Sequence, residues 1–287
     1  MSEVRTDLAL ESGALEQGGA VAGVETRQEA AEGWPLTVVD IVTDQGARAL
    51  GKPRGSYLTL DLSDYRTAGA DAFPRAVAAV GACLDRLLPQ KTGSALVVGL
   101  GNRSVTPDAI GPRCADHVLV TRHLTQRDPE QFGSFFPVAA LAAGVLGTTG
   151  VESGELVEAV CRKIRPDFIL AVDALAARSV RRLCTTIQIA DTGITPGSGV
   201  GNARKALNRD TLGVPVIALG VPTVVDGSTL AREFGGQQAA QQELEPVLVT
   251  PKDVDTLVTE LAKVVGYGIN ACLQPGLTVA DMDYFLG

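Results

Sequence analysis

Two aspartates stand where apolar segments end, and this placement makes them the strongest candidates for chemistry in the chain. Asp173 directly follows the apolar run 169–172, and Asp108 closes the tripeptide 106–108 shortly after the apolar run 95–100. Open α/β sheets place their active sites at the carboxyl ends of parallel strands. Two neighbouring carboxyl groups cannot both ionise readily, so one keeps its proton near neutral pH. Such a pair can activate water as a base and protonate a leaving amide nitrogen as an acid.

Each aspartate also has a structural alternative. Asp108 follows Pro107 at the expected start of a helix, where an aspartate commonly caps the first turn. Asp173 would be partly desolvated after its apolar run, so it needs a partner or a raised pKa. An ion pair with Arg178 would supply that partner. The residues alone leave the catalytic and the structural interpretations open.

Other site classes are less well supported. The two aspartates could hold a metal ion, but the only histidines, His117 and His123, are expected in one helix and at its end. Gly99 and Gly101 lack the third glycine of a dinucleotide-binding loop. The tripeptide 191–193 reads Asp-Thr-Gly, as in pepsin-type proteases, but those are all-β proteins. A catalytic triad with a serine or cysteine nucleophile is not expected, because the sequence has no Gly-x-Ser-x-Gly elbow with suitable partners and no cysteine close to a histidine. From these residues we expect no cofactor, and a metal ion held by the two aspartates stays an open alternative.

Composition narrows the class of protein. The chain has 287 residues, a net charge of -8 and 45% hydrophobic residues. This acidic balance argues against nucleic acid or an anionic membrane as partner, and no apolar run approaches the ~20 residues of a membrane helix. The five cysteines lack CxxC spacing, so we expect reduced thiols in the core of a cytoplasmic protein.

Hydrophobic patterning predicts an α/β protein: a single doubly wound, three-layer α/β/α domain with a mostly parallel central sheet. Residues 1–34 lack the periodicity of a packed element, so we expect a leader at 1–7, a mobile N-terminal segment at 8–34 and the α/β domain at 35–287. The Gln-rich stretch 235–242 is expected to be a solvated loop or short helix. Strands are expected at 36–42, 57–62, 95–100, 168–172, 185–189 and 214–219, and helices at 71–88, 108–123, 156–164, 174–183 and 252–272.

Many motifs make the chain similar to the germination proteases of endospore-forming bacteria. The most telling are Val105-Thr106-Pro107-Asp108-Ala109 and Asp173-Ala174-Leu175-Ala176-Ala177-Arg178-Ser179, which contain the two aspartates. The resemblance runs nearly end to end. The other matching runs are 5–9, 57–60, 97–102, 119–124, 144–150, 185–189, 191–194, 196–202, 220–226 and 249–252.

This resemblance implies an endopeptidase related in fold to the hydrogenase-maturation proteases, with Asp108 and Asp173 as the catalytic pair and no tightly bound metal. The substrates implied are small acid-soluble spore proteins, cut after an acidic and before an apolar residue in the spore core at germination. The family is made as a self-processing zymogen and is typically a homo-oligomer, a tetramer. Two alternatives are a metal-dependent maturation protease and a catalytically idle binding protein on the same scaffold.

Two departures from the family concern assembly and activation. The region between Asp226 and Leu248 is much shorter than in better-known members, and very little chain precedes Asp7, so any propeptide is a stub. The run Thr6-Asp7-Leu8-Ala9 repeats the pattern of the family's cleavage sites, which predicts self-cleavage between Asp7 and Leu8. Arg178 is our first candidate to receive the acidic side chain of the substrate, and Arg122 is the second. The residues expected to line the cleft are Asn102, Thr148, Thr149, Arg178, Asp191 and Thr223.

Overall fold

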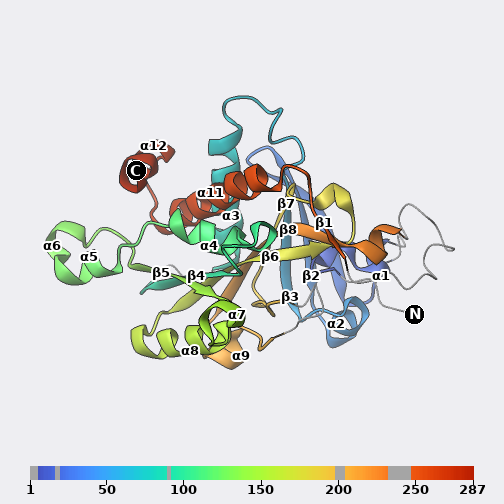
Figure 1. The fold of residues 1–287 in the computed structure, drawn as a ribbon, viewed down its shortest axis with the longest axis horizontal. Coiled ribbons are helices and arrows are strands. Elements are labelled where there is room, and N and C mark those ends of the chain that lie inside the picture. The colour runs from blue at the N-terminus through green and yellow to red at the C-terminus, as the bar shows by residue number, and fades with distance from the viewer. Residues whose placement is uncertain (1–5, 17–19, 89–91, 198–203, 232–246) are drawn as a thin grey trace.

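The chain forms one large twisted sheet with helices on both faces (Figure 1). The computed structural model describes residues 6–16, 20–88, 92–197, 204–231 and 247–287, so the Gln-rich stretch 235–242 lies outside the described residues. The strand order is β1-β2-β3-β7-β8-β6-β4-β5, and β9 pairs with β8. The strands are β1 (Val24–Ala31), β2 (Trp34–Ile41), β3 (Gly55–Asp61), β4 (Ala95–Leu100), β5 (Val138–Gly144), β6 (Phe168–Ala177), β7 (Thr186–Ala190), β8 (Val216–Asp226) and β9 (Leu248–Val249).

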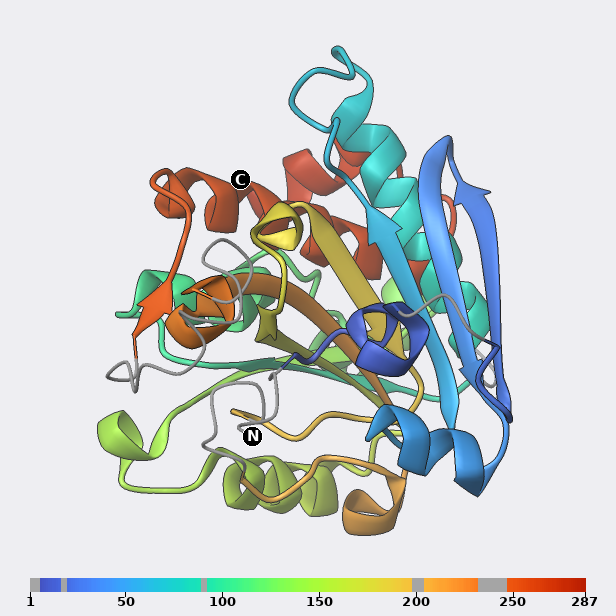
Figure 2. The same cartoon turned by 90° about the vertical axis from the view of Figure 1, so that its right-hand side faces the viewer.

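The sheet has a parallel and an antiparallel half. Strands β5, β4, β6 and β8 run parallel to one another, and β4, β6 and β8 are apolar almost throughout because they are buried on both faces. Strands β1, β2, β3, β7 and β9 join by antiparallel pairing, as Figure 2 shows for β1 to β3 at its right. The predicted α/β class is confirmed. The parallel pairing predicted for the sheet holds for these four strands, and the antiparallel strands make the whole sheet mixed.

Three layers result from helices packed on the two faces (Figure 1). Helices α3 (Ala72–Leu87), α4 (Ile110–Asp116) and α11 (Val254–Leu273) cover one face and enclose the largest apolar core. On the other face, α8 (Ser153–Ile164) covers the parallel half, and η1 (Ala9–Glu11) and α1 (Gly13–Glu16) pack with α2 (Asp44–Leu50) over the antiparallel half. Further helices are η2 (Thr106–Asp108), α5 (Arg122–Arg127), α6 (Pro129–Phe132), α7 (Leu146–Thr149), η3 (Val180–Arg182), α9 (Arg209–Leu212) and α12 (Val279–Leu286).

The predicted helix at 174–183 is wrong, because β6 continues as a strand to Ala177. Leu175 and Ala177 lie on one side of the strand and pack with Leu183 and Val225. Strand β8 is equally long and pairs with β6 as far as Ala177. Pairing and burial therefore override the helical preference of this alanine-rich stretch.

The predicted helix at 108–123 is also wrong in extent, because α4 ends at Asp116. The buried side chain of Asn270 in α11 donates to the His117 carbonyl at 2.8 Å and accepts from the Leu119 amide at 2.9 Å. These bonds satisfy the backbone groups that a continuing helix would have used. A contact from the far end of the chain thus stops the helix.

The predicted mobile segment 8–34 contains packed structure. Leu8 and Ala9 are fully buried, and β1 pairs with β2 along its whole length. Strand β1 is an edge strand with charged side chains, and six of its eight residues are exposed. Its sequence therefore lacks the apolar alternation by which a half-buried strand is recognised. All five cysteines are buried and none forms a disulfide, as predicted for reduced thiols.

Candidate active site

Asp173 lies within β6 as a buried carboxyl group, with only 5% of its surface exposed. Its Oδ1 accepts a hydrogen bond from the Ala174 amide at 2.9 Å. Burial, and next the negative charge of Asp108, raise the pKa of Asp173 well above its ordinary value. Asp173 is therefore suited to hold a proton at a pH where an ordinary aspartate has lost it.

Asp108 reaches the same site from η2, in the loop that follows β4. Its Oδ2 accepts a hydrogen bond of 2.7 Å from the Asn102 amide, and the Thr223 hydroxyl donates to the Pro107 carbonyl at 2.6 Å. Gly101 has φ 105°, and a Cβ there would stand 2.1 Å from the Asp108 carbonyl oxygen. Only glycine allows the loop to fold this tightly against Asp108.

The two carboxyl groups have unequal environments. Burial raises the pKa of Asp108, while the Asn102 amide and the positive charge of Arg204 lower it. The charge of Arg204 also lowers the pKa of Asp173, against the stronger effect of burial. Because Asp173 is the more deeply buried and its pKa is raised further, it is the better suited of the two to hold the proton, and Asp108 is the better suited to ionise. Two carboxyl groups with such unequal environments have the properties that a general base and a general acid require.

The N-terminal segment is docked beside this pair. The Asp7 amide donates to the Ala176 carbonyl and the Asp7 carboxylate accepts from the Ala176 amide, both at 2.9 Å. The negative charge of Asp7 contributes to the raised pKa of Asp173, so the two carboxyl groups are near neighbours. The register between β6 and β8 shifts after Leu175 and leaves Thr223 without a partner residue in β6. Such a shift re-aims backbone groups, here next to the site.

Further contacts hold the segment on either side of Leu8. The buried Glu11 carboxylate accepts from the Arg178 amide at 2.6 Å and from the Ser179 amide at 3.1 Å. The Leu8 side chain is fully buried in an apolar cluster that includes Leu175 and Leu183. The segment therefore presents an acidic residue, then an apolar one, along the end of β6.

A lysine faces the two acids of this segment. Burial lowers the pKa of Lys52, and the charges of Asp7 and Glu11 raise it. A positive charge in the range of both carboxylates partly balances them. Lys52 therefore belongs to the electrostatic surroundings of the docked segment.

Some of the residues expected to line the cleft are at the aspartate pair. Asn102 and Thr223 hold Asp108 and its loop through the bonds given above. Arg178 lies beside the docked segment, and its backbone amide binds Glu11.

The other expected cleft residues make contacts within their own segments or with β3. Thr148 and Thr149 are exposed in α7, where their hydroxyl groups bond to backbone of the same turn. Asp191 accepts a 2.8 Å hydrogen bond from the Ser56 amide of β3. It follows Ala190, which pairs with Ala218 towards the amino end of β8, so the structure does not bring Asp191 to the pair.

The sequence argument missed Arg204, Glu11 and Lys52. Glu11 had a signal, because it closes a short apolar and acidic island at 5–11. Arg204 and Lys52 had none, since each reaches the site from a loop whose position depends on distant packing.

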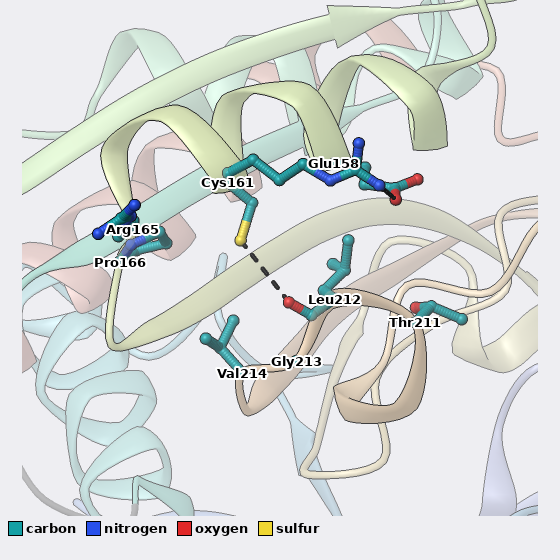
Figure 3. A pocket seen from close by; sticks show the side chains of 9 residues that line it. Glu158, Cys161, Arg165, Pro166, Thr211, Leu212, Gly213 and Val214 are labelled. Atoms are coloured by element: carbon teal, nitrogen blue, oxygen red, sulfur yellow. Dashed lines mark hydrogen bonds and ion pairs between the residues drawn. The ribbon is translucent and has the colours of Figure 1, made fainter.

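A separate pocket lies at the opposite end of the parallel strands (Figure 3). It has a volume of about 610 Å³ and is formed by the carboxyl end of α8 and the loop after α9. The Cys161 thiol points from α8 towards the Leu212 carbonyl oxygen, 3.9 Å away. Pro166 and Val214 of its wall precede the first residues of β6 and β8, so this pocket is at the amino ends of these strands.

Two other features were sought in the described ranges. No group of three or more His, Cys, Asp or Glu residues with metal-binding geometry is found there. No helix described, the 20-residue α11 included, is long and apolar enough to cross a membrane.

Comparison with known proteins places this geometry in a family. Residues 4–234 match the family model described as germination protease. A germination protease of Caldanaerobacter subterraneus subsp. tengcongensis is 41% identical over 99% of this chain and 98% of its own length, and one of Clostridium perfringens is 40% identical over the whole of both. A germination protease of Geobacillus sp. is 43% identical over 81% of this chain and 66% of its own. The Clostridium alignment spans 328 positions, more than the 287 residues here, so that relative has segments that this chain lacks.

The chain therefore belongs to the germination protease family, a family of hydrolases that cut peptide bonds.

Proposed function

We propose that this protein is an endopeptidase that begins the degradation of small acid-soluble spore proteins in the spore core at germination. It cuts after an acidic residue and before an apolar one, with Asp108 and Asp173 as its acid–base pair. The observation that carries this proposal is the docked N-terminal segment, whose Asp7 and Leu8 have this order and lie beside Asp173. Membership of the germination protease family supports the same conclusion.

The chemistry follows from the unequal pair. Ionised Asp108 takes a proton from a water molecule, whose oxygen then bonds to the carbonyl carbon of the acidic residue. Protonated Asp173 gives its proton to the leaving amide nitrogen as the carbon–nitrogen bond breaks. The Asn102 amide and Arg204 favour the ionised form of Asp108, while burial favours the protonated form of Asp173. Each carboxyl group is thereby prepared for its step.

Self-processing is part of the proposal. The zymogen hydrolyses its own Asp7–Leu8 bond and releases residues 1–7, which leaves Leu8 as the mature N-terminus. The docked position of Thr6 to Glu11 supports this, because Thr6, Asp7, Leu8 and Glu11 bond to the end of β6 or to each other around the proposed bond. The active protein is a homo-oligomer, as the family resemblance implies.

Fragment mapping tests this function. The full chain is incubated with a small acid-soluble spore protein, with and without a chelator, and the products are identified by mass spectrometry. We expect fragments that end in Glu or Asp and begin with an apolar residue, at equal rates in both samples. Activity lost on chelation and restored by metal would favour a metal-dependent maturation protease. Tight binding without cleavage would mean an inactive binding protein.

A further inference from the structure

Four residues form a row across the sheet, on the face that carries Asp173. Thr59 of β3 pairs with Gln188 of β7, Gln188 with Gly220 of β8, and Gly220 with Asp173 of β6. Paired residues on neighbouring strands point to the same face. The neighbours Ile187 and Ile189 pack into the core on the opposite face, which confirms the direction of Gln188. Asp173 and Gln188 therefore flank a strand position that has no side chain.

The docked segment meets this row at Gln188, whose side chain is only 7% exposed. Its Nε2 donates a 3.0 Å hydrogen bond to the Asp7 carbonyl oxygen. Its Oε1 accepts a 2.7 Å hydrogen bond from the Ala9 amide. The side-chain amide of Gln188 thus binds the backbone on both sides of Leu8. Its NH₂ group donates to the carbonyl oxygen of the Asp7–Leu8 peptide bond.

We propose that Gln188 is a catalytic residue whose Nε2–H stabilises the oxyanion formed during peptide hydrolysis. The inference rests on the proposed function, because it takes Asp7–Leu8 as the bond that is cut. The oxyanion forms on the Asp7 carbonyl oxygen, which Nε2 already contacts at 3.0 Å in the intact bond, and donors to an oxyanion act at about 2.7–3.1 Å. In a site with so little exposed surface, such a hydrogen bond is worth more than in water.

The step assigns every electron pair and proton. A water molecule gives one proton to Asp108 as its oxygen bonds to the carbonyl carbon, the C=O π pair moves onto the carbonyl oxygen, and the Nε2–H of Gln188 stabilises the resulting negative charge. When the carbonyl re-forms, the carbon–nitrogen bond breaks and the leaving nitrogen takes a proton from Asp173. Gln188 keeps its own protons throughout. Its Oε1 meanwhile keeps the residue after Leu8 in place through the Ala9 amide.

Kinetics on Gln188 variants test the assignment. The substrate is a synthetic peptide of residues 2–14 of this chain, and kcat and KM are measured separately at one pH. Gln188→Met keeps the size of the side chain but removes both hydrogen bonds. We expect its kcat to fall ~10²–10³-fold, the usual loss for one oxyanion donor, with a smaller change in KM. Gln188→Glu retains the acceptor for Ala9 and should lose as much in kcat.

Thr59→Val is the matched control. Thr59 neighbours Gln188 on the same face, is 1% exposed, and its hydroxyl has no hydrogen-bond partner in the described part of the chain. This variant should keep kcat and KM within about twofold, and thermal unfolding verifies that all variants fold. Raised KM with unchanged kcat in both Gln188 variants would overturn the inference, since Gln188 would then only bind backbone. A wild type that cleaves neither the peptide nor its own chain would instead overturn the proposed function, and the inference with it.

Discussion

The two ends of β6 differ in a way that shows what makes a site. At the amino end there is an open pocket of about 610 Å³. There the side chain of Arg162, which pairs with Glu158, is 78% exposed. Around the carboxyl end, Asp173 is 5% exposed, a second carboxyl raises its pKa, and backbone amides bind an acidic segment. A catalytic site depends on titratable groups that lie close together and are shielded from water, more than on the volume of a cavity. The comparison predicts large effects at one end and almost none at the other.

The largest effect is expected at the aspartate pair. Asp173→Asn and Asp108→Asn each remove a proton-transfer group but keep the shape of the side chain. We expect kcat to fall by ~10²–10⁴ for each, and the double variant to lose little more, because the two act as a unit. Steady-state cleavage of a spore-protein peptide checks this. Turnover within tenfold of wild type in folded Asp173→Asn would break the distinction between the two ends.

Asp173 should also make the free energy of unfolding depend on pH, so that the folded protein becomes less stable as pH rises. Because the pKa of Asp173 is raised in the folded protein, the folded state binds more protons than the unfolded state above pH ~4. The free energy of unfolding of wild type should therefore fall relative to Asp173→Asn by at most ~1.4 kcal/mol per pH unit, until the folded pKa is passed. Urea unfolding of both proteins between pH 4 and 8 measures the difference. Parallel stability curves would show that Asp173 has an ordinary pKa.

Selection of an acidic residue should depend moderately on Arg178. Its backbone amide already binds Glu11, and its positive charge would favour a substrate carboxylate. We expect Arg178→Ala to lower the preference for Glu over Gln before the cut bond by ~10-fold, about the effect of one screened charge. Paired peptides give the ratio of kcat/KM values, with Arg162→Ala as the control. A full preference in Arg178→Ala would assign Arg178 a structural role and leave selection to the Ala176 amide and Lys52.

The smallest effect is expected at the amino-end pocket. Arg162→Ala removes an exposed partner of Glu158, and exposed ion pairs contribute ~0–1 kcal/mol. Activity should stay within twofold of wild type, and the free energy of unfolding within ~0.5 kcal/mol. Parallel activity and urea-unfolding assays check both. A tenfold loss of kcat would mean that this pocket communicates with the site.

The same contrast explains what the sequence could predict. The apolar runs of β4, β6 and β8 are signals within single segments, so these strands and the place of Asp108 after β4 were predictable. The strand end expected at Asp173 is wrong, because β6 continues to Ala177. The contact between Asp7 and Ala176 joins residues 169 positions apart, next to the register shift between β6 and β8. No local pattern encodes such pairing. Strand β1 was not predicted for another reason: it is an exposed edge strand, and its sequence has no alternation of apolar and polar residues.

Gln188 belongs to the same unpredictable class. Within the run of β7 it stands between two core isoleucines, and its polarity indicates only that one face of the strand differs from the other. Its relation to the site comes from β8, where Gly220 pairs with both Gln188 and Asp173 and so lies between them. The acidic island at 5–11 was visible in the sequence, but its place in the site was not. Sequence identified the chemical groups, and pairing of distant strands determined which of them meet.

The most direct test of the account is the mass of the full chain over time, for wild type and for Asp173→Asn. We predict that wild type loses residues 1–7 and acquires Leu8 as its N-terminus, while Asp173→Asn stays intact under the same conditions. N-terminal sequencing identifies the bond. Equal processing of the two proteins, or full activity of a wild type that retains its original N-terminus, would contradict the claim that the aspartate pair acts on the segment docked beside it.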